Sequence, residues 1–143
     1  MTDTPDTEQS VDPSWAVQTA IYDRLRARLP DVDIIDNVEA AEYENALPFI
    51  LIGDDILSDD DNQITNEYKI RTFIRCHAEG PHRKASKALA HRVRKAMADD
   101  FEIDGFISDD LISKHIGTQN ALVEGIAHVA VVEWLFDLLE DNV

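Results

Sequence analysis

A run of nine residues with strict period-two alternation constrains the fold of this chain more than any other feature. From Tyr68 to Cys76, the residues Tyr, Ile, Thr, Ile and Cys alternate with Lys, Arg, Phe and Arg. Alternate side chains of a β-strand point to opposite faces, so the pattern is typical of a strand with one buried and one exposed face. The sequence predicts this strand over residues 64–76, and such a strand requires a sheet with a layer covering it.

A second long strand is predicted over residues 126–138, and it is apolar on both faces. A strand of this kind must be covered on both sides. Because only two helices are predicted in the chain, we expect a neighbouring subunit to cover one side. One face carries Ile126, Ala130, Val132, Trp134 and Phe136, and the other carries Ala127, Val129, Val131 and Leu135.

Two amphipathic helices are predicted. The first begins at Pro13, with Asp12 as its N-cap, and is stopped by Pro30. The second opens at Pro81 and runs to about Met97. Their apolar faces are predicted to consist of Val17, Ala20, Ile21, Leu25 and Leu29 in the first helix, and of Ala85, Ala88, Leu89, Val93, Ala96 and Met97 in the second.

The order of helix, strands, helix, strands predicts an α+β fold, with a mostly antiparallel sheet and the two helices packed on one face. Residues 12–143 are expected to form one domain. Residues 1–11 have almost nothing to bury, so they are expected to form a flexible arm. Shorter segments are predicted as a strand or turn entry at 32–36, a buried strand at 48–53, an exposed aspartate-rich loop at 53–63, a strand or turn at 101–107, a strand at 111–116 and a polar tip at 117–125.

The chain is strongly acidic, and its charges are segregated. Its 143 residues carry 29 Asp and Glu against 13 Lys and Arg, a formal net charge of −16. This charge excludes binding to nucleic acid or to anionic lipid by bulk neutralisation. Nine of the basic residues lie between positions 68 and 95, where Glu79 is the single acidic residue. This basic island indicates either complementarity with an acidic partner or subunit, or merely solvated strand and helix faces.

The sequence shows no targeting segment and no membrane span. The first twelve residues, MTDTPDTEQSVD, lack the basic and apolar regions of a signal peptide. No apolar run approaches the roughly 18–20 residues that a spanning helix needs. We therefore expect no membrane partner.

The sequence carries none of the common catalytic or cofactor-binding motifs. Phosphate-binding, dinucleotide-binding, zinc-protease and nucleophile-elbow motifs are missing from the sequence. Cys76, His77 and His82 fall short of the four ligands usual at zinc sites. The acidic run after Gly53 lacks the spacing of an EF-hand loop. No catalytic, cofactor-binding or metal-binding residue is assigned, and we expect a protein that is not an enzyme.

The order of these segments resembles the tail completion (tail terminator) family of long-tailed bacteriophages and gene transfer agents. Four pieces carry the resemblance: AVQTAIYDRL at 16–25, PFILIGDD at 48–55, EYKIRTFIRCH at 67–77 leading into an alanine-rich basic helix, and the strand, tip and closing strand of 111–138. They cover about 125 residues. None is a chemical motif, so the match depends on their order and spacing.

The resemblance implies a structural virion protein. Such proteins form rings, usually of six copies, that cap the head-proximal end of the tail tube, stop its growth and dock the head connector. The implied partners are further copies of the chain, the tail tube protein and the head connector or stopper, with DNA passing through unbound. The resemblance also implies assembly in the host cytoplasm and location at the head–tail junction of the virion. The resemblance transfers no catalytic residue and no cofactor.

Three groups of residues are assigned to this role. The basic residues are expected to meet acidic surface on the next subunit, the apolar pair at the 117–125 tip to dock the tube or connector, and the acidic loop to line the DNA channel. The groups are Lys69, Arg71, Arg75, Arg83, Lys84 and Lys87 for the interface, Leu122 and Val123 for docking, and Asp59, Asp60 and Asp61 for the channel. The acidic loop is alternatively predicted to face solvent outside the ring.

Two other functions remain open from the sequence. One is a small metal-dependent enzyme that uses Asp54, Asp55 and Asp59. The other is an adaptor or inhibitor whose acidic surface mimics DNA.

Overall fold

The computed structural model describes residues 12–36, 47–59, 67–79, 83–107, 111–123 and 127–139. The arm predicted over residues 1–11 lies outside this part of the chain. The elements are α2 (Pro13–Arg28), β1 (Asp33–Ile35), β2 (Phe49–Asp59), β3 (Glu67–Glu79), α4 (Lys84–Met97), β4 (Ile112–Val123) and β5 (Ala127–Leu139).

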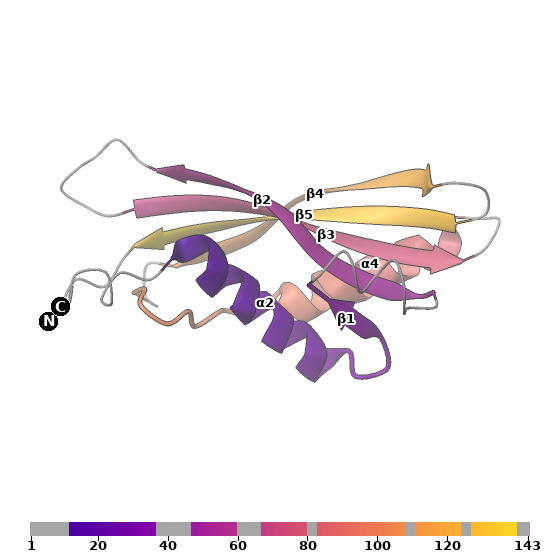
Figure 1. The fold of residues 1–143 in the computed structure, drawn as a ribbon, viewed down its shortest axis with the longest axis horizontal. Coiled ribbons are helices and arrows are strands. Elements are labelled where there is room, and N and C mark those ends of the chain that lie inside the picture. The colour runs from indigo at the N-terminus through magenta and orange to yellow at the C-terminus, as the bar shows by residue number, and fades with distance from the viewer. Residues whose placement is uncertain are drawn as a thin grey trace, which may run out of the picture.

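The five strands form one sheet in the order β1-β2-β3-β5-β4. The short β1 pairs with β2 in parallel, and the other three pairings are antiparallel. The α+β class is thus confirmed, and so is the mainly antiparallel sheet. Figure 1 shows a long twisted sheet with α2 and α4 together on one side.

The first helix forms as predicted. The Asp12 carboxylate accepts a hydrogen bond of 3.0 Å from the backbone N–H of Ser14, and Pro13 occupies the first helical position. This capping satisfies one of the N–H groups that a helix leaves unpaired at its start. Val17, Ile21 and Leu25 are fully buried against the sheet and α4.

The second helix forms, but the predicted apolar face was partly wrong. Ala85 and Ala88 are exposed, whereas Ser86 and Ala90 are fully buried. The buried set of α4 is Ser86, Leu89, Ala90, Val93, Ala96 and Met97. Ser86 is tolerated there because its hydroxyl donates to the carbonyl of Arg83 at 3.1 Å, which satisfies the polar group locally. The predicted start at Pro81 lies outside the described residues.

The alternation in β3 is confirmed. Ile70, Thr72, Ile74 and Cys76 are buried on the face that α2 and α4 cover. On the neighbouring β5, the residues from Ala130 to Leu138 that point to the same face are also buried. The core of the protein therefore lies between one face of the sheet and the two helices.

An exposed loop was predicted from Gly53 onward, but this prediction was wrong for the residues up to Asp59. The strand β2 continues through this segment and stays paired with β3 to the register Asp59↔Tyr68. A bulge at Gly53/Asp55 absorbs one residue, and Asp54 adopts a positive φ of 47° there. Polar composition favours a loop locally, but the long β3 offers a complete hydrogen-bond ladder, and pairing satisfies the backbone groups.

A polar tip was predicted from Gly117 onward, and this prediction was also wrong for the residues up to Val123. The strand β4 continues to Val123, and its register with β5 runs to Val123↔Ala127. A bulge at His115/Gly117 marks the point where the predicted strand was expected to end. The turn-forming residues after it lie in a ladder because β5 presents a long partner strand.

The segment 101–107, predicted as a short strand or turn, forms a connection with a turn at Asp104 and Gly105 and a single bridge residue at Phe106. Phe101, Ile103 and Phe106 are buried and anchor it to the core. The ring of Phe101 meets that of Phe136 edge-on, with centroids 5.2 Å apart. Gly105 turns the chain with a φ of 90°, which favours glycine because it has no Cβ.

Candidate interaction surfaces

The sheet face opposite the helices is open in the described part of the chain. On β3 it carries Lys69, Arg71, Phe73, Arg75 and His77, and on β5 it carries Val129, Val131, Glu133, Leu135 and Asp137. Val129 is buried, and the other four β5 residues are half-buried. The second face of β5 is therefore covered only in part by the segments that the structure describes.

Two of the basic residues assigned to an interface are already paired on this open face. The Nε atom of Arg71 lies 2.6 Å from a carboxylate oxygen of Glu133, and Arg75 lies 2.7 Å from Asp54. Both pairs join neighbouring strands and both involve exposed side chains, so each contributes little to stability. Their charges are satisfied before any partner arrives.

His77 lies at the apolar end of this face. Its ring stacks on Phe49 with centroids 4.5 Å apart and an interplanar angle of 12°. Its Nε2 atom is buried and has no hydrogen-bond partner in the described structure. Burial, and secondarily the Arg75 guanidinium, lower the pKa of His77 below its usual value.

The environment of His77 is expected to make the folded protein less stable at acidic pH. Because the pKa of His77 is lower in the folded state, the unfolded chain takes up the proton first as pH falls through about 6.5. The His77 contribution is therefore present above that pH and is lost below it. The His77→Phe variant keeps the ring stack on Phe49 but has no imidazole to protonate. Between pH 7 and pH 5, we expect its free energy of unfolding, measured with urea, to fall less than that of the wild type. Equal losses would contradict this role.

The other three assigned basic residues lie in a different place. Arg83 precedes α4, and Lys84 and Lys87 are on its exposed side. Since α4 packs on the helix-covered face, these residues and the three on β3 lie on opposite sides of the sheet. The six residues therefore do not form one patch, because the sheet lies between the two groups.

Only some of the residues assigned to docking and to the DNA channel lie in the described part of the chain. Leu122 and Val123 belong to β4, opposite His128 and Ala127 of β5, so they do not lie in a loop. Asp59 is the last residue of β2. Asp60 and Asp61 lie outside the described residues.

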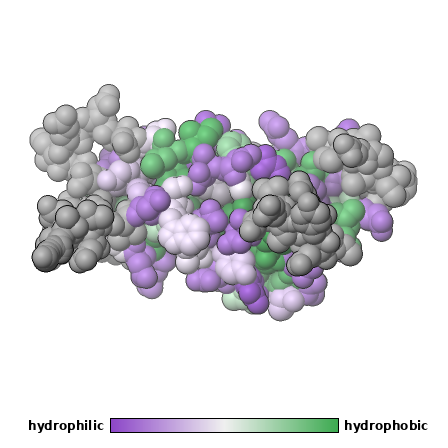
Figure 2. Space-filling model, in the orientation of Figure 1, coloured by the Kyte–Doolittle hydropathy of each residue, from purple (hydrophilic) through white to green (hydrophobic). Residues whose placement is uncertain are grey.

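At both edges of the sheet, strand segments pair on one side only in the described structure, a feature that sequence reasoning missed. Strand β1 pairs only with Phe49–Leu51, so in the described structure the distal half of β2 pairs only with β3. Strand β4 likewise pairs only with β5 there. Figure 2 shows hydrophobic residues over the distal half of β2. The exposed large apolar residues of the two edges are Ile56, Leu57, Ile112 and Ile116, and free apolar edges favour strand pairing with another chain.

A hollow of about 290 Å³ lies between the first half of α2 and the connection after α4. Trp15 forms part of its wall and is 61% exposed. Three carboxylate residues, Asp23, Glu102 and Asp104, share the lining. None of them forms an ion pair with another described residue.

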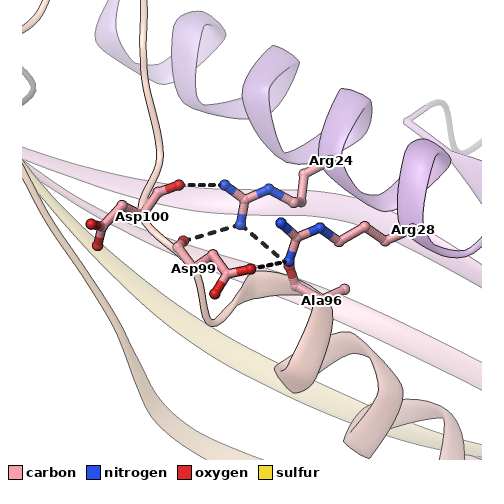
Figure 3. Close-up of polar contacts among 5 residues, drawn as sticks. All are labelled: Arg24, Arg28, Ala96, Asp99 and Asp100. Atoms are coloured by element: carbon pink, nitrogen blue, oxygen red, sulfur yellow. Dashed lines mark hydrogen bonds and ion pairs between the residues drawn. The ribbon is translucent and has the colours of Figure 1, made fainter.

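Two arginines of α2 contact the segment that leads from α4 to the hollow (Figure 3). The Arg24 guanidinium donates to the carbonyls of Ala96, Asp99 and Asp100 at 3.2, 3.1 and 2.6 Å. It also lies 3.7 Å from the centroid of the Phe101 ring. Arg28 adds a bond to the Ala96 carbonyl and an ion pair of 2.7 Å with Asp99. These contacts fasten the end of α4 and the residues after it to α2.

The described carboxylates that were considered for metal chemistry are engaged otherwise. Asp54 pairs with Arg75, and Asp55 accepts a hydrogen bond from the hydroxyl of Ser14. Within the described ranges, no three His, Cys, Asp or Glu side chains lie together as metal ligands would. None of the described helices combines the length and apolar character needed to cross a membrane.

The chain matches no protein family model and no curated protein. Among solved structures, it is similar to a chain from the virion of a native gene transfer agent particle. The identity is 17%, the TM-score is 0.73, and the alignment covers 91% of this chain and 99% of the other. The two chains therefore share a fold along nearly their whole lengths.

Proposed function

We propose that this chain is a structural virion protein that forms a ring at the head-proximal end of a phage-type tail tube. It ends the growth of the tube and joins it to the head connector. The observation that carries the proposal is the near-complete fold likeness to a chain of a gene transfer agent virion. The tail terminator role, the copy number of six and the tube and connector as partners come from the resemblance of the sequence segments.

The surfaces of the molecule support a protein that assembles with copies of itself. A ring interface joins two different patches, one from each neighbour. Within the described residues, both edges of the sheet have strand segments that pair on one side only, with exposed apolar residues on each edge. Of the assigned basic residues, Arg71 and Arg75 have partners within the chain, so the α4 residues Lys84 and Lys87 are the stronger interface candidates.

The acidic charge fits a ring through which DNA passes without being held. Six copies at −16 each carry about −96 in all. Carboxylates near a channel repel phosphates and keep the duplex centred, over a screening length of about 8 Å at physiological salt. We propose that Asp59, at the end of β2, and the adjoining Asp60 and Asp61 lie toward this channel.

Deletion of the gene in a particle-producing cell tests the proposal. We expect heads and tails that fail to join, with tail tubes of uncontrolled length, because nothing caps the growing tube. Electron microscopy of the lysate measures both effects. Wild-type protein supplied in trans is the control and should restore joined particles with tails of uniform length. Joined particles with normal tails in the deletion strain would contradict the proposal.

A further inference from the structure

The hollow beside Trp15 has the composition of a site for a cationic side chain. An exposed tryptophan ring attracts an ammonium or guanidinium group through its quadrupole. Asp23 on α2 and Glu102 and Asp104 on the connection supply carboxylates around the same hollow. Since none of the three pairs with a described cation, their charge remains available to a partner.

The hollow is also built to keep its shape. Trp15 and Asp23 are on the regular helix α2, whose first turn is capped by Asp12. Glu102 and Asp104 are flanked by the buried residues Phe101, Ile103 and Phe106. The Arg24 contacts fix the start of this connection to α2 (Figure 3). A preformed site loses little conformational entropy when it binds.

A matching cationic surface lies on α4 of the same molecule. Lys84, Lys87 and Lys95 are exposed and lie on the side of the helix away from its buried residues. None of them forms an ion pair with a described carboxylate. In Figure 1, α2 begins near the left end of the molecule and α4 begins toward the right end, so the hollow and the first lysines are well separated.

We infer that the hollow lined by Trp15, Asp23, Glu102 and Asp104 receives lysine side chains from α4 of a second copy of this chain. The two surfaces differ in shape and charge and lie toward opposite ends of the molecule, so the contact is head-to-tail and repeats from copy to copy. The inference rests on the proposed function in one respect, that the repeat closes into a ring. The contact itself requires only self-association.

Charge-swap complementation tests the contact. One variant, Glu102→Lys with Asp104→Lys, makes the hollow basic. The other variant, Lys84→Glu with Lys87→Glu, makes the α4 surface acidic. Each variant alone opposes like charges at every head-to-tail contact, whereas alternating copies of the two restore opposite charges at all of them. We expect each variant to reduce covalent oligomers about ten-fold, and an equimolar mixture to recover them to within about two-fold of wild type.

The oligomers are measured with an amine–carboxylate cross-linker on concentrated purified protein and resolved as a ladder of sizes. Arg26→Glu, which changes a charge of α2 outside the hollow, is the control and should leave the ladder unchanged. Trp15→Ala should reduce it and Trp15→Phe should partly restore it, because phenylalanine keeps an aromatic face. Circular dichroism verifies that each variant is folded. Failure of the mixture to recover the ladder would overturn the inference.

The inference and the proposed function fail in distinguishable ways. A recovered ladder in solution, together with normal particles from the deletion strain, supports the contact and contradicts the virion role. If both charge variants still assemble normally as rings at the neck of particles, the contact is contradicted and the virion role is left intact.

Discussion

Replacing Phe136 with alanine is expected to destabilise the protein by about 4 kcal/mol, because it opens a cavity at the centre of the core. The side chain is fully buried, and β5 lies between β3 and β4 in the sheet. Its edge-on contact with Phe101 is lost with the ring. Urea unfolding followed by circular dichroism measures the change in the free energy of unfolding.

Leu135 provides the matched control for this substitution. It precedes Phe136 on the same strand but points to the open face, where it is half-buried. We expect Leu135→Ala to cost about 1 kcal/mol, the usual size for a partly exposed site. Similar losses for the two variants would show that the open face is packed as fully as the helix-covered face.

Replacing Arg24 with alanine is expected to cost about 3 kcal/mol. The guanidinium donates to three backbone carbonyls, of which that of Ala96 belongs to the last turn of α4 and has no partner within its own helix. Removing it leaves the Asp99 and Asp100 carbonyls without this donor, while Arg28 still donates to the carbonyl of Ala96. The substitution also strips the cation from the Phe101 ring. Arg24→Lys should retain part of the stability, because one ammonium group cannot reproduce the planar fork.

Arg26→Ala is the control on the same helix. Its guanidinium is exposed and bonds only to the Tyr22 hydroxyl at 2.9 Å in the described structure. We expect a loss of at most about 0.5 kcal/mol. Thermal unfolding compares the three variants. If Arg24→Ala and Arg26→Ala behave alike, the contacts shown in Figure 3 do not hold the connection to α2.

Local patterns were sufficient to predict several elements. The Asp12–Pro13 pair and the stripe through Val17, Ile21 and Leu25 predicted α2, because capping and helical periodicity act within a few residues. The alternation around Ile70 and Ile74 predicted both the strand β3 and its buried face. These predictions succeeded because each depends on interactions between near neighbours in the chain.

The distal half of β2 and the end of β4 were beyond prediction for the opposite reason. Aspartates after Gly53 and turn-forming residues after Gly117 favour loops when read alone. They form strands because β3 and β5 lie beside them and offer unpaired backbone groups along their whole length. Which strands lie side by side is settled by the packing of the whole domain.

Composition and local periodicity were sufficient to predict the α+β class, the capped first helix, the buried face of the alternating strand and the basic island in an acidic chain. How those charges are distributed over the surface depends on the folded domain. It placed Arg71 and Arg75 on the open face with partners, and Lys84 and Lys87 on the far side of the sheet without partners among the described residues. It also brought Trp15 beside Glu102 and Asp104, more than eighty positions away in the chain. The physical reason is that periodicity and capping act over a few residues, whereas a surface is made by segments that only the folded core brings together.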